Sequence, residues 1–451
     1  MGSNAHRHLE LDVQDYQSSQ NGGRRDDTAA FEQAIDIIRS NGGGRLIIPG
    51  APDGSFNLYR IRPINLTSHL VLFLQKNAVI TAIADESVWP LIPPLPSYGQ
   101  GRDHVGPRYS SLLHGEYLTN ITIRGEPDSP GIIDGQGRYW WDRRRHNRDR
   151  YTRGHLVEFM YSSRIRMYNL RLQNSPFWTN HFYDCDDVHV QNVHVKAPWS
   201  SPNTDGWDPD SSRNVLIEDS TYRGGDDCVA IKSGWDCFGI DYDTPSENIT
   251  IRNVTCQGPY AGIAIGTEMS GGVRNVTVEN VTFTYANKPA NIKTGNTRGG
   301  YVHDVVYQNI RITGHIDQAI HVDMYHYHNT PNPSCSNNYQ PNQLPHLRDL
   351  YFFNFEGTQA LTESHEVFHF VGLPESPIEY VFLENISFPT PVSSLGWNCS
   401  NVQGSVKNNS VTPWPPCPEF PSVTVENSET MSPWNAFLTF LFLTTAVLGR
   451  A

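Results

Sequence analysis

Positive charge is scarce in this sequence. The 451 residues contain 34 Lys and Arg against 47 Asp and Glu, which gives a formal net charge of −13 at pH 7. This balance argues against nucleic acid as a partner, because phosphate backbones attract basic surfaces. An acidic polymer of another kind is compatible with the charge only if basic residues gather locally in a cleft.

Long hydrophobic runs are also few. Residues 1–10 are polar, and no hydrophobic signal peptide follows Met1. An apolar stretch over 434–448 is interrupted by Thr and Asn and is short for a membrane span. It is interpreted as a GPI-attachment signal, a tail anchor or a frayed terminus. We therefore expect a polar segment over 1–10, one main domain over 11–420, and a tail over 421–451.

Cysteine is sparse, with seven residues. Cys399 and Cys417 flank a segment containing Trp and Pro and are expected to close a loop. The odd number leaves at least one thiol free or paired between chains. Together with many Asn-X-Ser/Thr sequons, the cysteines favour a secreted glycoprotein, although Asn also suits the turns of repetitive β-structure. The sequons include Asn65, Asn120, Asn275, Asn385 and Asn398.

Helical periodicity is weak in most of the chain, whereas a two-residue alternation of polar and apolar residues recurs from Asn120 onward. Each unit places apolar residues on one side, toward a core, and most units continue with Asn followed by Val, Ile or Leu. The pattern predicts an all-β fold, a single-stranded right-handed parallel β-helix. The units open at Asn120, Arg164, Asp187, Asn214, Asn248, Asn275, Asp304 and Tyr380.

One helix is predicted near the N-terminus, over residues 27–39. Asp27 is expected to cap it, and Phe31, Ile35 and Ile38 fall on one face. Such a helix would cover the open end of the β-helix, where unpaired strand edges are a hazard. Residues 85–110, rich in Pro and Gly, are expected to form a long loop over the body of the molecule.

Two short carboxylate clusters occupy the middle of the chain, Asn203-Thr204-Asp205 and Gly224-Gly225-Asp226-Asp227. A separation of 21 positions between Asp205 and Asp226 is one coil of a β-helix, and consecutive coils stack about 4.8 Å apart. The spacing therefore brings three carboxylates together, with the glycine pair permitting a bend that aims both later acids into one cleft. The alternative is that these are ordinary turn aspartates.

These residues resemble the signature of the polygalacturonase family, glycoside hydrolase family 28, in its plant polygalacturonase-like subgroup. The similarity lies in Asn203-Thr204-Asp205, Gly225-Asp226-Asp227 and Ile292-Lys293. It implies hydrolysis of α-1,4-galacturonosyl linkages in pectin with inversion, with Asp226 as proton donor and Asp205 and Asp227 holding the attacking water. It also implies that Lys293 and Asn203 bind substrate.

The resemblance has further implications for the molecule as a whole. It pairs Cys228 with Cys256 in a disulfide. The expected protein is a monomer of the cell wall or extracellular space that binds an acidic plant cell-wall polysaccharide and needs no metal or other cofactor. Membrane contact is expected only through a C-terminal anchor.

Two positions depart from the family pattern. Ala261 stands where many members have a histidine, and Asn291 stands where the family has an arginine before Ile292-Lys293. Both changes remove positive charge near the carboxylates. They leave two alternatives open: a catalytically weak pectin- or wall-binding protein, or a hydrolase of another pectic polymer such as rhamnogalacturonan.

Two further hypotheses concern chemistry and charge. A Ca²⁺-dependent pectate lyase on the same type of fold is a third alternative, since the three aspartates are suitable Ca²⁺ ligands. Residues 138–153 contain seven Arg and are interpreted either as a solvated loop or as an arm that attracts an acidic polysaccharide.

Overall fold

The computed structural model describes residues 9–16, 26–99, 102–326, 335, 344–358, 366–388, 396–408, 410–412 and 417–423. The predicted C-terminal anchor segment, 434–448, and most of the polar segment 1–10 lie outside these residues. None of the helices in the described ranges is long and apolar enough to cross a membrane.

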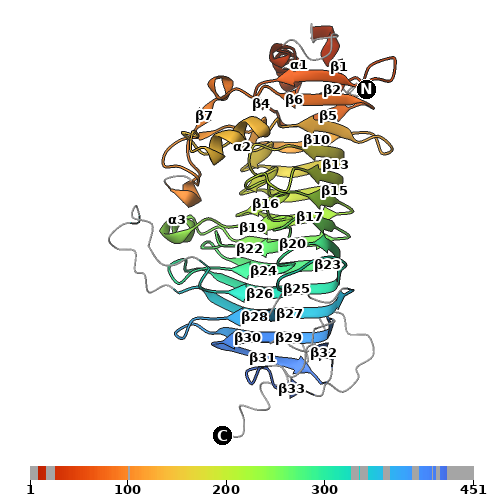
Figure 1. Ribbon diagram of the computed structural model, residues 1–451. Coiled ribbons are helices and arrows are strands. Elements are labelled where there is room, and N and C mark those ends of the chain that lie inside the picture. Colours follow the sequence, from red (N-terminus) through yellow and green to blue (C-terminus); the bar gives the residue numbers. More distant parts are fainter. Residues whose placement is uncertain are drawn as a thin grey trace, which may run out of the picture.

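The strands wind into a right-handed parallel β-helix, as the sequence pattern predicts. Two long sheets form its walls, one of 20 strands and one of 11, and the coils stack along one axis (Figure 1). Every strand pairing in these two sheets is parallel. Alternate side chains of each strand point into a continuous hydrophobic core that runs the length of the molecule.

The larger sheet contains β1 (Glu10–Asp12), β2 (Gly44–Ile48), β3 (Asn57–Ile61), β5 (Leu70–Leu74), β6 (Ala78–Ala82), β10 (Thr119–Arg124), β11 (Gly131–Asp134), β13 (Ser163–Gln173), β15 (Asp186–Lys196), β17 (Arg213–Glu218), β18 (Thr221–Arg223), β20 (Ser246–Arg252), β21 (Thr255–Gln257), β23 (Val273–Tyr285), β25 (Tyr301–Ile312), β27 (His346–Gly357), β29 (Ile378–Ser387), β31 (Val402–Lys407), β32 (Val411–Thr412) and β33 (Ser422–Val423).

The smaller sheet, which carries the candidate site, contains β4 (Ile64–Asn65), β9 (Leu113–Glu116), β12 (Val157–Met160), β14 (Asn180–Tyr183), β16 (Trp207–Asp210), β19 (Val229–Ile231), β22 (Ile263–Ile265), β24 (Ala290–Lys293), β26 (Ile320–Asp323), β28 (Glu366–Val371) and β30 (Gly396–Ser400). The helices are α1 (Thr28–Ser40), α2 (Arg138–Arg145) and α3 (Asp236–Tyr242).

Helix α1 caps the N-terminal end of the β-helix, as predicted (Figure 1). Phe31, Ile35 and Ile38 are buried and join the main core. The expected side-chain cap is wrong in its detail. Asp27 occupies the N-cap position, but its carboxylate accepts the backbone N–H of Arg60 at 3.0 Å instead of capping the helix. The aspartate therefore ties the helix to β3.

The residues that open the repeat units share one backbone conformation. All eight, from Asn120 to Tyr380, have left-handed φ values between 53° and 60°. Asn tolerates this region because its short amide can hydrogen-bond locally. Stacked amides then link successive coils: Asn248 Nδ2 donates to Asn214 at 3.1 Å, and Asn275 Nδ2 donates to Asn248 at 2.7 Å. The repeated Asn is thus explained by turn geometry and a side-chain ladder.

Two segments are more ordered than the sequence indicated. The 85–110 segment, expected as a loop, includes an antiparallel pair, β7 (Leu91–Ile92) with β8 (Arg108–Tyr109). The arginine-rich 138–153 segment contains helix α2, and several of its arginines are ion-paired. Arg143 contacts Glu86 at 2.6 Å, and the buried Arg153 contacts Asp103 at 3.2 Å. Part of the positive charge of this segment is therefore neutralised within the protein.

Three disulfides join the described cysteines. Cys228–Cys256 and Cys399–Cys417 are present as expected, and a third bond joins Cys237 to Cys335. The seventh cysteine, Cys185, is a buried free thiol. Burial raises its pKa, so the thiol stays protonated and unreactive.

Candidate active site

The strand register of the smaller sheet stacks the candidate acids. Trp207 of β16 pairs with Val229 of β19, and Asp205 and Asp227 each precede that pair by two residues. Backbone bonds fasten the turns, since Gly206 N–H donates to the Asp227 carbonyl at 3.0 Å. The two aspartates thus occupy the same place on consecutive coils, which confirms the spacing argument.

The three predicted carboxylates converge. One oxygen each from Asp205, Asp226 and Asp227 lies within 4.8 Å of the others. Asp205 and Asp227 are 3% and 4% exposed, whereas Asp226 is only partly buried. Oδ1 of Asp205 is buried without a hydrogen-bond partner among the described residues. An oxygen in that state is available to hold a water molecule or a substrate hydroxyl.

Burial and mutual repulsion shift the titration of this cluster. Burial, reinforced by Asp226 and Asp208, raises the pKa of Asp205 well above its usual range. Burial also raises the pKa of Asp227 to about 6, although Lys293 opposes the shift. Nζ of Lys293 lies 3.0 Å from Oδ2 of Asp227 and favours its ionised form. The cluster can therefore hold both protonated and ionised carboxyls near mildly acidic pH.

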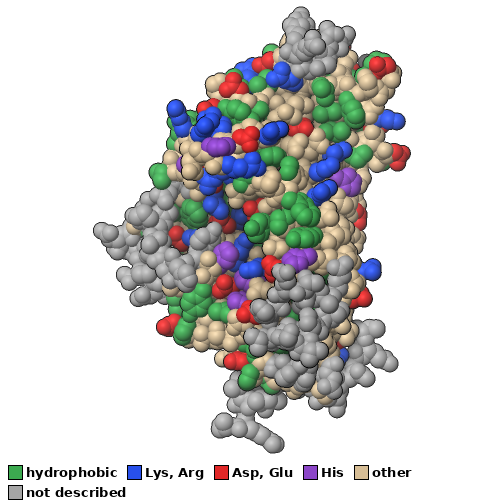
Figure 2. Space-filling view, in the orientation of Figure 1, with side chains coloured by type: hydrophobic (Ala, Val, Ile, Leu, Met, Phe, Trp, Pro, Cys, Tyr) green, Lys and Arg blue, Asp and Glu red, His purple; other side chains and the backbone are tan. Residues whose placement is uncertain are grey.

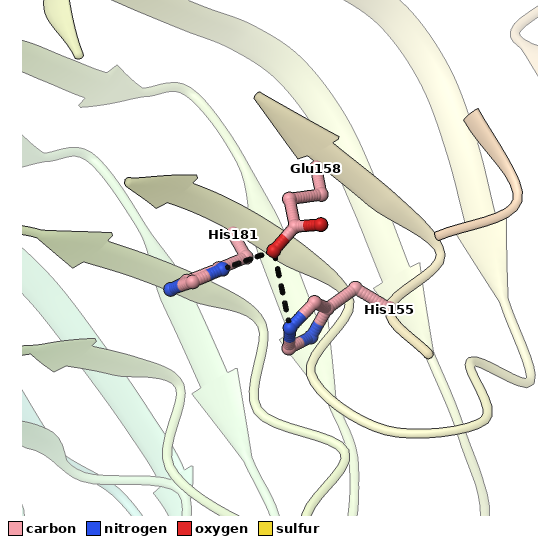
Figure 3. A group of neighbouring side chains, drawn as sticks. All are labelled: His155, Glu158 and His181. Carbon is pink, nitrogen blue, oxygen red and sulfur yellow. Dashed lines mark hydrogen bonds and ion pairs between the residues drawn. The ribbon is translucent and has the colours of Figure 1, made fainter. Parts of the chain in front are cut away.

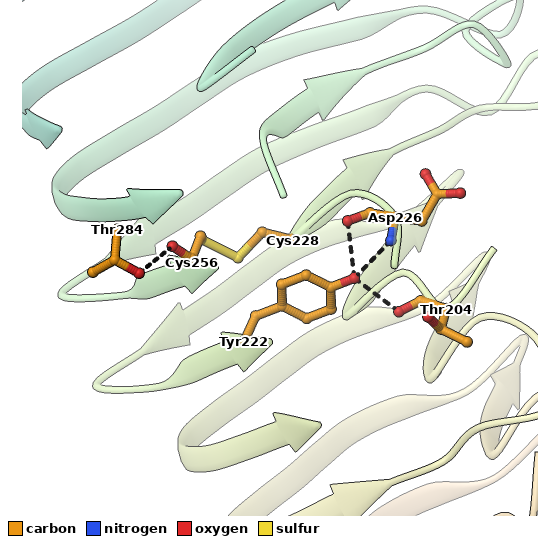
Figure 4. Close-up of a disulfide and its surroundings, with 6 residues drawn as sticks. All are labelled: Thr204, Tyr222, Asp226, Cys228, Cys256 and Thr284. Atoms are coloured by element: carbon orange, nitrogen blue, oxygen red, sulfur yellow. Dashed lines mark hydrogen bonds between the residues drawn. A yellow bond between two sulfur atoms is a disulfide. The ribbon is translucent and has the colours of Figure 1, made fainter. Parts of the chain in front are cut away.

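A buried tyrosine braces the two acid-bearing turns (Figure 4). The Tyr222 hydroxyl accepts the backbone N–H of Asp226 at 3.1 Å, and it lies 3.0 Å from the Thr204 carbonyl oxygen and 2.9 Å from that of Asp226. The Cys228–Cys256 disulfide follows directly and links this coil to the next. The sequence alone did not identify Tyr222 as part of the site, because only its position two residues before Gly224 distinguishes it from other tyrosines.

The glycine pair lies in a bend of the backbone, as predicted, and it also allows close packing. Neither Gly224 nor Gly225 has a positive φ. A Cβ on Gly224 would lie 2.2 Å from the Tyr222 hydroxyl, and one on Gly225 would lie 2.1 Å from the Ser201 carbonyl oxygen. The bend therefore needs no left-handed backbone angles, and glycine is required at both positions for close packing.

Asn203 is engaged within the protein. Its Nδ2 donates to Oδ2 of Asp226 at 3.3 Å, and its Oδ1 accepts from the buried Arg153 guanidinium at 2.8 Å. Arg153 is fixed in turn by the Pro202 carbonyl at 2.9 Å. The predicted substrate-binding residue thus has a protein partner at each end of its amide and orients Asp226.

A second buried charge cluster contains Glu158 of β12, His181 of β14 and Asp210 of β16, together with His155, which lies two residues before β12. Figure 3 shows His155, Glu158 and His181. His181 lies 2.9 Å from Glu158 and 3.3 Å from Asp210, and His155 lies 3.4 Å from Glu158. The spacing of His155, Glu158 and His181 would suit a metal ion. However, Arg108 donates to both oxygens of Glu158, at 2.7 and 3.0 Å, so the carboxylate is already neutralised.

This cluster anchors the 85–110 segment over the sheet. The Tyr98 hydroxyl donates to Oδ2 of Asp210 at 2.6 Å, and Arg108 comes from the same segment. Burial lowers the pKa of His155, whereas the carboxylates on either side raise that of His181 against the effect of its burial. Sequence reasoning missed this network, because its members are far apart in the chain and only the β-helix register brings them together.

The two positions that depart from the family pattern lie on the next coils. Ala261 precedes β22 by two residues, is fully buried and packs in the main core. Asn291 lies on β24, and its Oδ1 lies 3.0 Å from Nδ1 of His321 on the neighbouring strand. The side chain that replaces the family arginine is therefore held by a histidine that the sequence did not single out.

Comparison with known proteins defines the class. The family described as glycosyl hydrolases family 28 matches residues 100–411, and the chain belongs to this family. It is a glycoside hydrolase. A probable polygalacturonase of Vitis vinifera is 37% identical over 401 residues, which covers 87% of this chain and 77% of the grape protein. A probable polygalacturonase of Arabidopsis thaliana is 28% identical and covers 85% of this chain and 75% of its own length.

Solved structures share the fold. The exopolygalacturonase of Thermotoga maritima superposes with a TM-score of 0.72 at 22% identity, over 89% of this chain and 91% of that one. The polygalacturonase of Erwinia carotovora superposes with a TM-score of 0.67 at 23% identity, over 85% and 95%.

Proposed function

We propose that this protein hydrolyses α-1,4-galacturonosyl linkages in pectin or polygalacturonan. The observation that carries the proposal is the convergence of Asp205, Asp226 and Asp227 within 4.8 Å, beside the Lys293 ammonium. Hydrolysis of a glycosidic bond needs one carboxyl group to protonate the leaving oxygen and another to activate water. The polygalacturonase relatives in grape and Arabidopsis support galacturonan as the substrate.

Each acid has a distinct proposed role. Asp226 is the proton donor, because it is the most accessible of the three and its carboxyl is oriented by Asn203. Asp205 and Asp227 hold the water, with the unpartnered Oδ1 of Asp205 as one acceptor. Lys293 keeps Asp227 ionised and attracts the carboxylate of the sugar. No metal ion takes part in this scheme.

The stereochemical proposal is inversion. The nearest oxygens of the three acids lie within 4.8 Å, whereas acid and base carboxyls of inverting enzymes lie about 6.5–9.5 Å apart. Nearest-oxygen spacing therefore does not select inversion, which rests here on the family resemblance. Proton NMR of the first product anomer formed from an oligogalacturonate decides the question directly.

The oxidised cysteines support an extracellular site of action. Three disulfides are typical of proteins that pass through an oxidising compartment. We therefore infer a secreted protein that acts, as a monomer, on the acidic polysaccharide of the plant cell wall.

The test is release of reducing ends from polygalacturonate by the full-length chain. Retention of the activity in EDTA, without an ultraviolet-absorbing unsaturated product, excludes the lyase alternative. Binding without turnover would support the wall-binding alternative, and turnover of rhamnogalacturonan alone would identify another pectic substrate. Either of these last two results overturns the proposal.

A further inference from the structure

Lys288 is aligned with Asp227 of the acid cluster in the stacked coils. Val229, Ile263 and Ala290 are register partners on β19, β22 and β24. The residues two positions before these partners are Asp227, Ala261 and Lys288, so the three lie at the same place on consecutive coils. With coils about 4.8 Å apart, Lys288 follows Asp227 by about 10 Å along the axis. A cation therefore stands in line with the acid cluster, two coils away.

The ammonium of Lys288 has no carboxylate within ion-pair distance among the described residues. Other buried or half-buried lysines do have one: Lys293 pairs with Asp227, and Lys232 pairs with Asp208 and Glu268. Asp323, Asp317 and Asp227 act on Lys288 only at longer range. Burial lowers the pKa of its ammonium, which is the expected sign for a cation that lacks a close counter-ion.

A neutral histidine fixes the direction of this lysine. Nζ of Lys288 lies 2.9 Å from Nε2 of His321, and Nδ1 of His321 lies 3.0 Å from Oδ1 of Asn291. An ammonium can only donate, so Nε2 accepts and Nδ1 carries the proton that is donated to Asn291. Burial and the neighbouring Lys288 hold the pKa of His321 well below its ordinary value, which keeps the ring neutral in acid.

The hydrogen bonds from Lys288 to His321 and from His321 to Asn291, here called the relay, leave N–H donors that no described residue accepts. With its Oδ1 occupied, Asn291 retains an Nδ2 amide group for which the described residues provide no acceptor. Lys288 retains two of its three N–H donors after bonding to His321. Lys293, on the same strand as Asn291, adds a second ammonium whose field reaches Lys288. The face of the molecule drawn in Figure 2 carries Lys, Arg and His side chains among acidic ones.

We propose that Lys288, oriented by His321 and assisted by Asn291, binds a carboxylate of the acidic polysaccharide one sugar beyond the position served by Lys293. The inference rests on the proposed function and deepens it. It explains how the chain tolerates asparagine in place of the family arginine: the cation comes from two residues before β24 instead. His321 is a positioning residue in this arrangement, and Lys288 contacts the substrate.

The experiment compares substrates with and without free carboxylates. The full-length chain and Lys288→Met, which keeps the length of the side chain without its charge, are assayed on oligogalacturonate and on the fully methyl-esterified oligomer. We expect KM for the acidic oligomer to rise about tenfold, a typical loss for a charge-assisted hydrogen bond, with kcat changed less than threefold. KM for the ester should change less than twofold. Lys196→Met, at an exposed lysine, is the matched control.

Two variants test the relay. His321→Gln retains an acceptor for Lys288 and should preserve most of the affinity, whereas His321→Leu should reproduce the Lys288→Met phenotype. Lys288→Arg should keep discrimination between acid and ester, and Lys288→Gln, which also removes the charge, substitutes for Lys288→Met if that variant does not fold. Unchanged KM for the acid in Lys288→Met, or equal losses on acid and ester, overturns the proposal.

Failure of the proposed function gives a different result. If the wild-type chain releases no reducing ends from galacturonan, hydrolysis of that polymer is refuted whatever Lys288 does. Calorimetric titration of the wild type and Lys288→Met with trigalacturonate then measures binding at the Lys288 site independently of hydrolysis. A tenfold weaker Kd in the variant supports the carboxylate site, and equal Kd values refute it.

Discussion

Nζ of Lys293 lies 3.0 Å from Oδ2 of Asp227, although 66 positions separate the two residues in the chain. One coil intervenes along the β-helix, since β22 lies between β19 and β24 in the smaller sheet. One ammonium therefore acts on a carboxylate of the acid cluster, and in the proposed function the same ammonium attracts the carboxylate of the sugar. Substitution of Lys293 is therefore expected to change two measurable properties.

We expect Lys293→Ala to alter both substrate affinity and the pH profile. Lys293 favours the ionised form of Asp227, so its loss should raise the pKa of Asp227 further above its present value of about 6. The acidic limb of the kcat/KM profile, which reports the free enzyme, should move to higher pH.

Lys293→Ala should also weaken the binding of acidic substrates more than the binding of methyl esters. The measurements are pH–rate profiles on oligogalacturonate and on its methyl ester, with Lys196→Ala as the control. An unshifted acidic limb with equal losses on both substrates would assign Lys293 a purely structural role.

Asp226→Asn should nearly abolish hydrolysis without unfolding the protein. The amide is nearly isosteric and can still contact Asn203, but it cannot deliver a proton to the leaving oxygen. A general acid commonly contributes about 10²–10⁴-fold to the rate. We expect a kcat loss in that range with thermal unfolding within about 2 °C of the wild type. Asp128→Asn, at an exposed turn, controls for the charge change. Survival of most of the kcat would remove Asp226 from the role of acid.

The β-helix and the acid cluster could be predicted because both depend on local repetition. The residues that open each coil are confined to left-handed turns, so Asn recurs at a fixed spacing, and stacking follows from that spacing. Asp205 and Asp227 converge for the same reason. Contacts of single residues that depend on the exact strand register could not be predicted from the repeat.

The residues that were not predicted act through hydrogen bonds that the repeat pattern does not specify. Tyr222 braces the acid turns through one hydroxyl, and a tyrosine in a strand is ordinarily interpreted as core. The relay from Lys288 through His321 joins residues 33 positions apart, with a proton arrangement that only hydrogen-bond geometry reveals. The need for glycine at position 225 has the same origin, since the crowding there comes from the carbonyl oxygen of Ser201, a residue of the preceding acid-bearing turn.

Removal of the Cys228–Cys256 disulfide should reduce activity as well as stability. Its loop of 28 residues corresponds to about 3–4 kcal/mol of stabilisation in the chain-entropy model. Cys228 directly follows Asp227, so release of the bond should loosen the acid turn. We expect the Cys228→Ser/Cys256→Ser variant to unfold at lower temperature and to lose about tenfold in kcat/KM.

The Cys399–Cys417 bond provides the comparison. It closes a loop of 18 residues at the C-terminal end of the described chain, away from the acids, and its stabilisation should be of similar size. Removing it should lower the unfolding temperature to a similar extent with kcat/KM unchanged at 25 °C. Equal activity in the two double variants would show that the first disulfide does not position the site.

Asp205→Asn should stabilise the folded protein while it inactivates the enzyme. Burial and the neighbouring acids raise the pKa of Asp205 in the folded state above its unfolded value near 4, so the folded state binds this proton more tightly. Stability contributed by this group is therefore fully present below pH 4 and falls as pH rises above it. Each unit by which the folded-state pKa exceeds the unfolded one corresponds to about 1.4 kcal/mol of stability.

Replacing the carboxyl of Asp205 with a neutral amide removes this loss of stability at high pH. We expect Tm to rise by at least about 2 °C at pH 7 and by less than about 1 °C at pH 4. Calorimetric unfolding at both pH values, with Asp128→Asn alongside, makes the measurement. A lower Tm at pH 7 would show that the ionised carboxylate of Asp205 is stabilised in the fold, and that the crowding of the acid cluster is relieved by its cations.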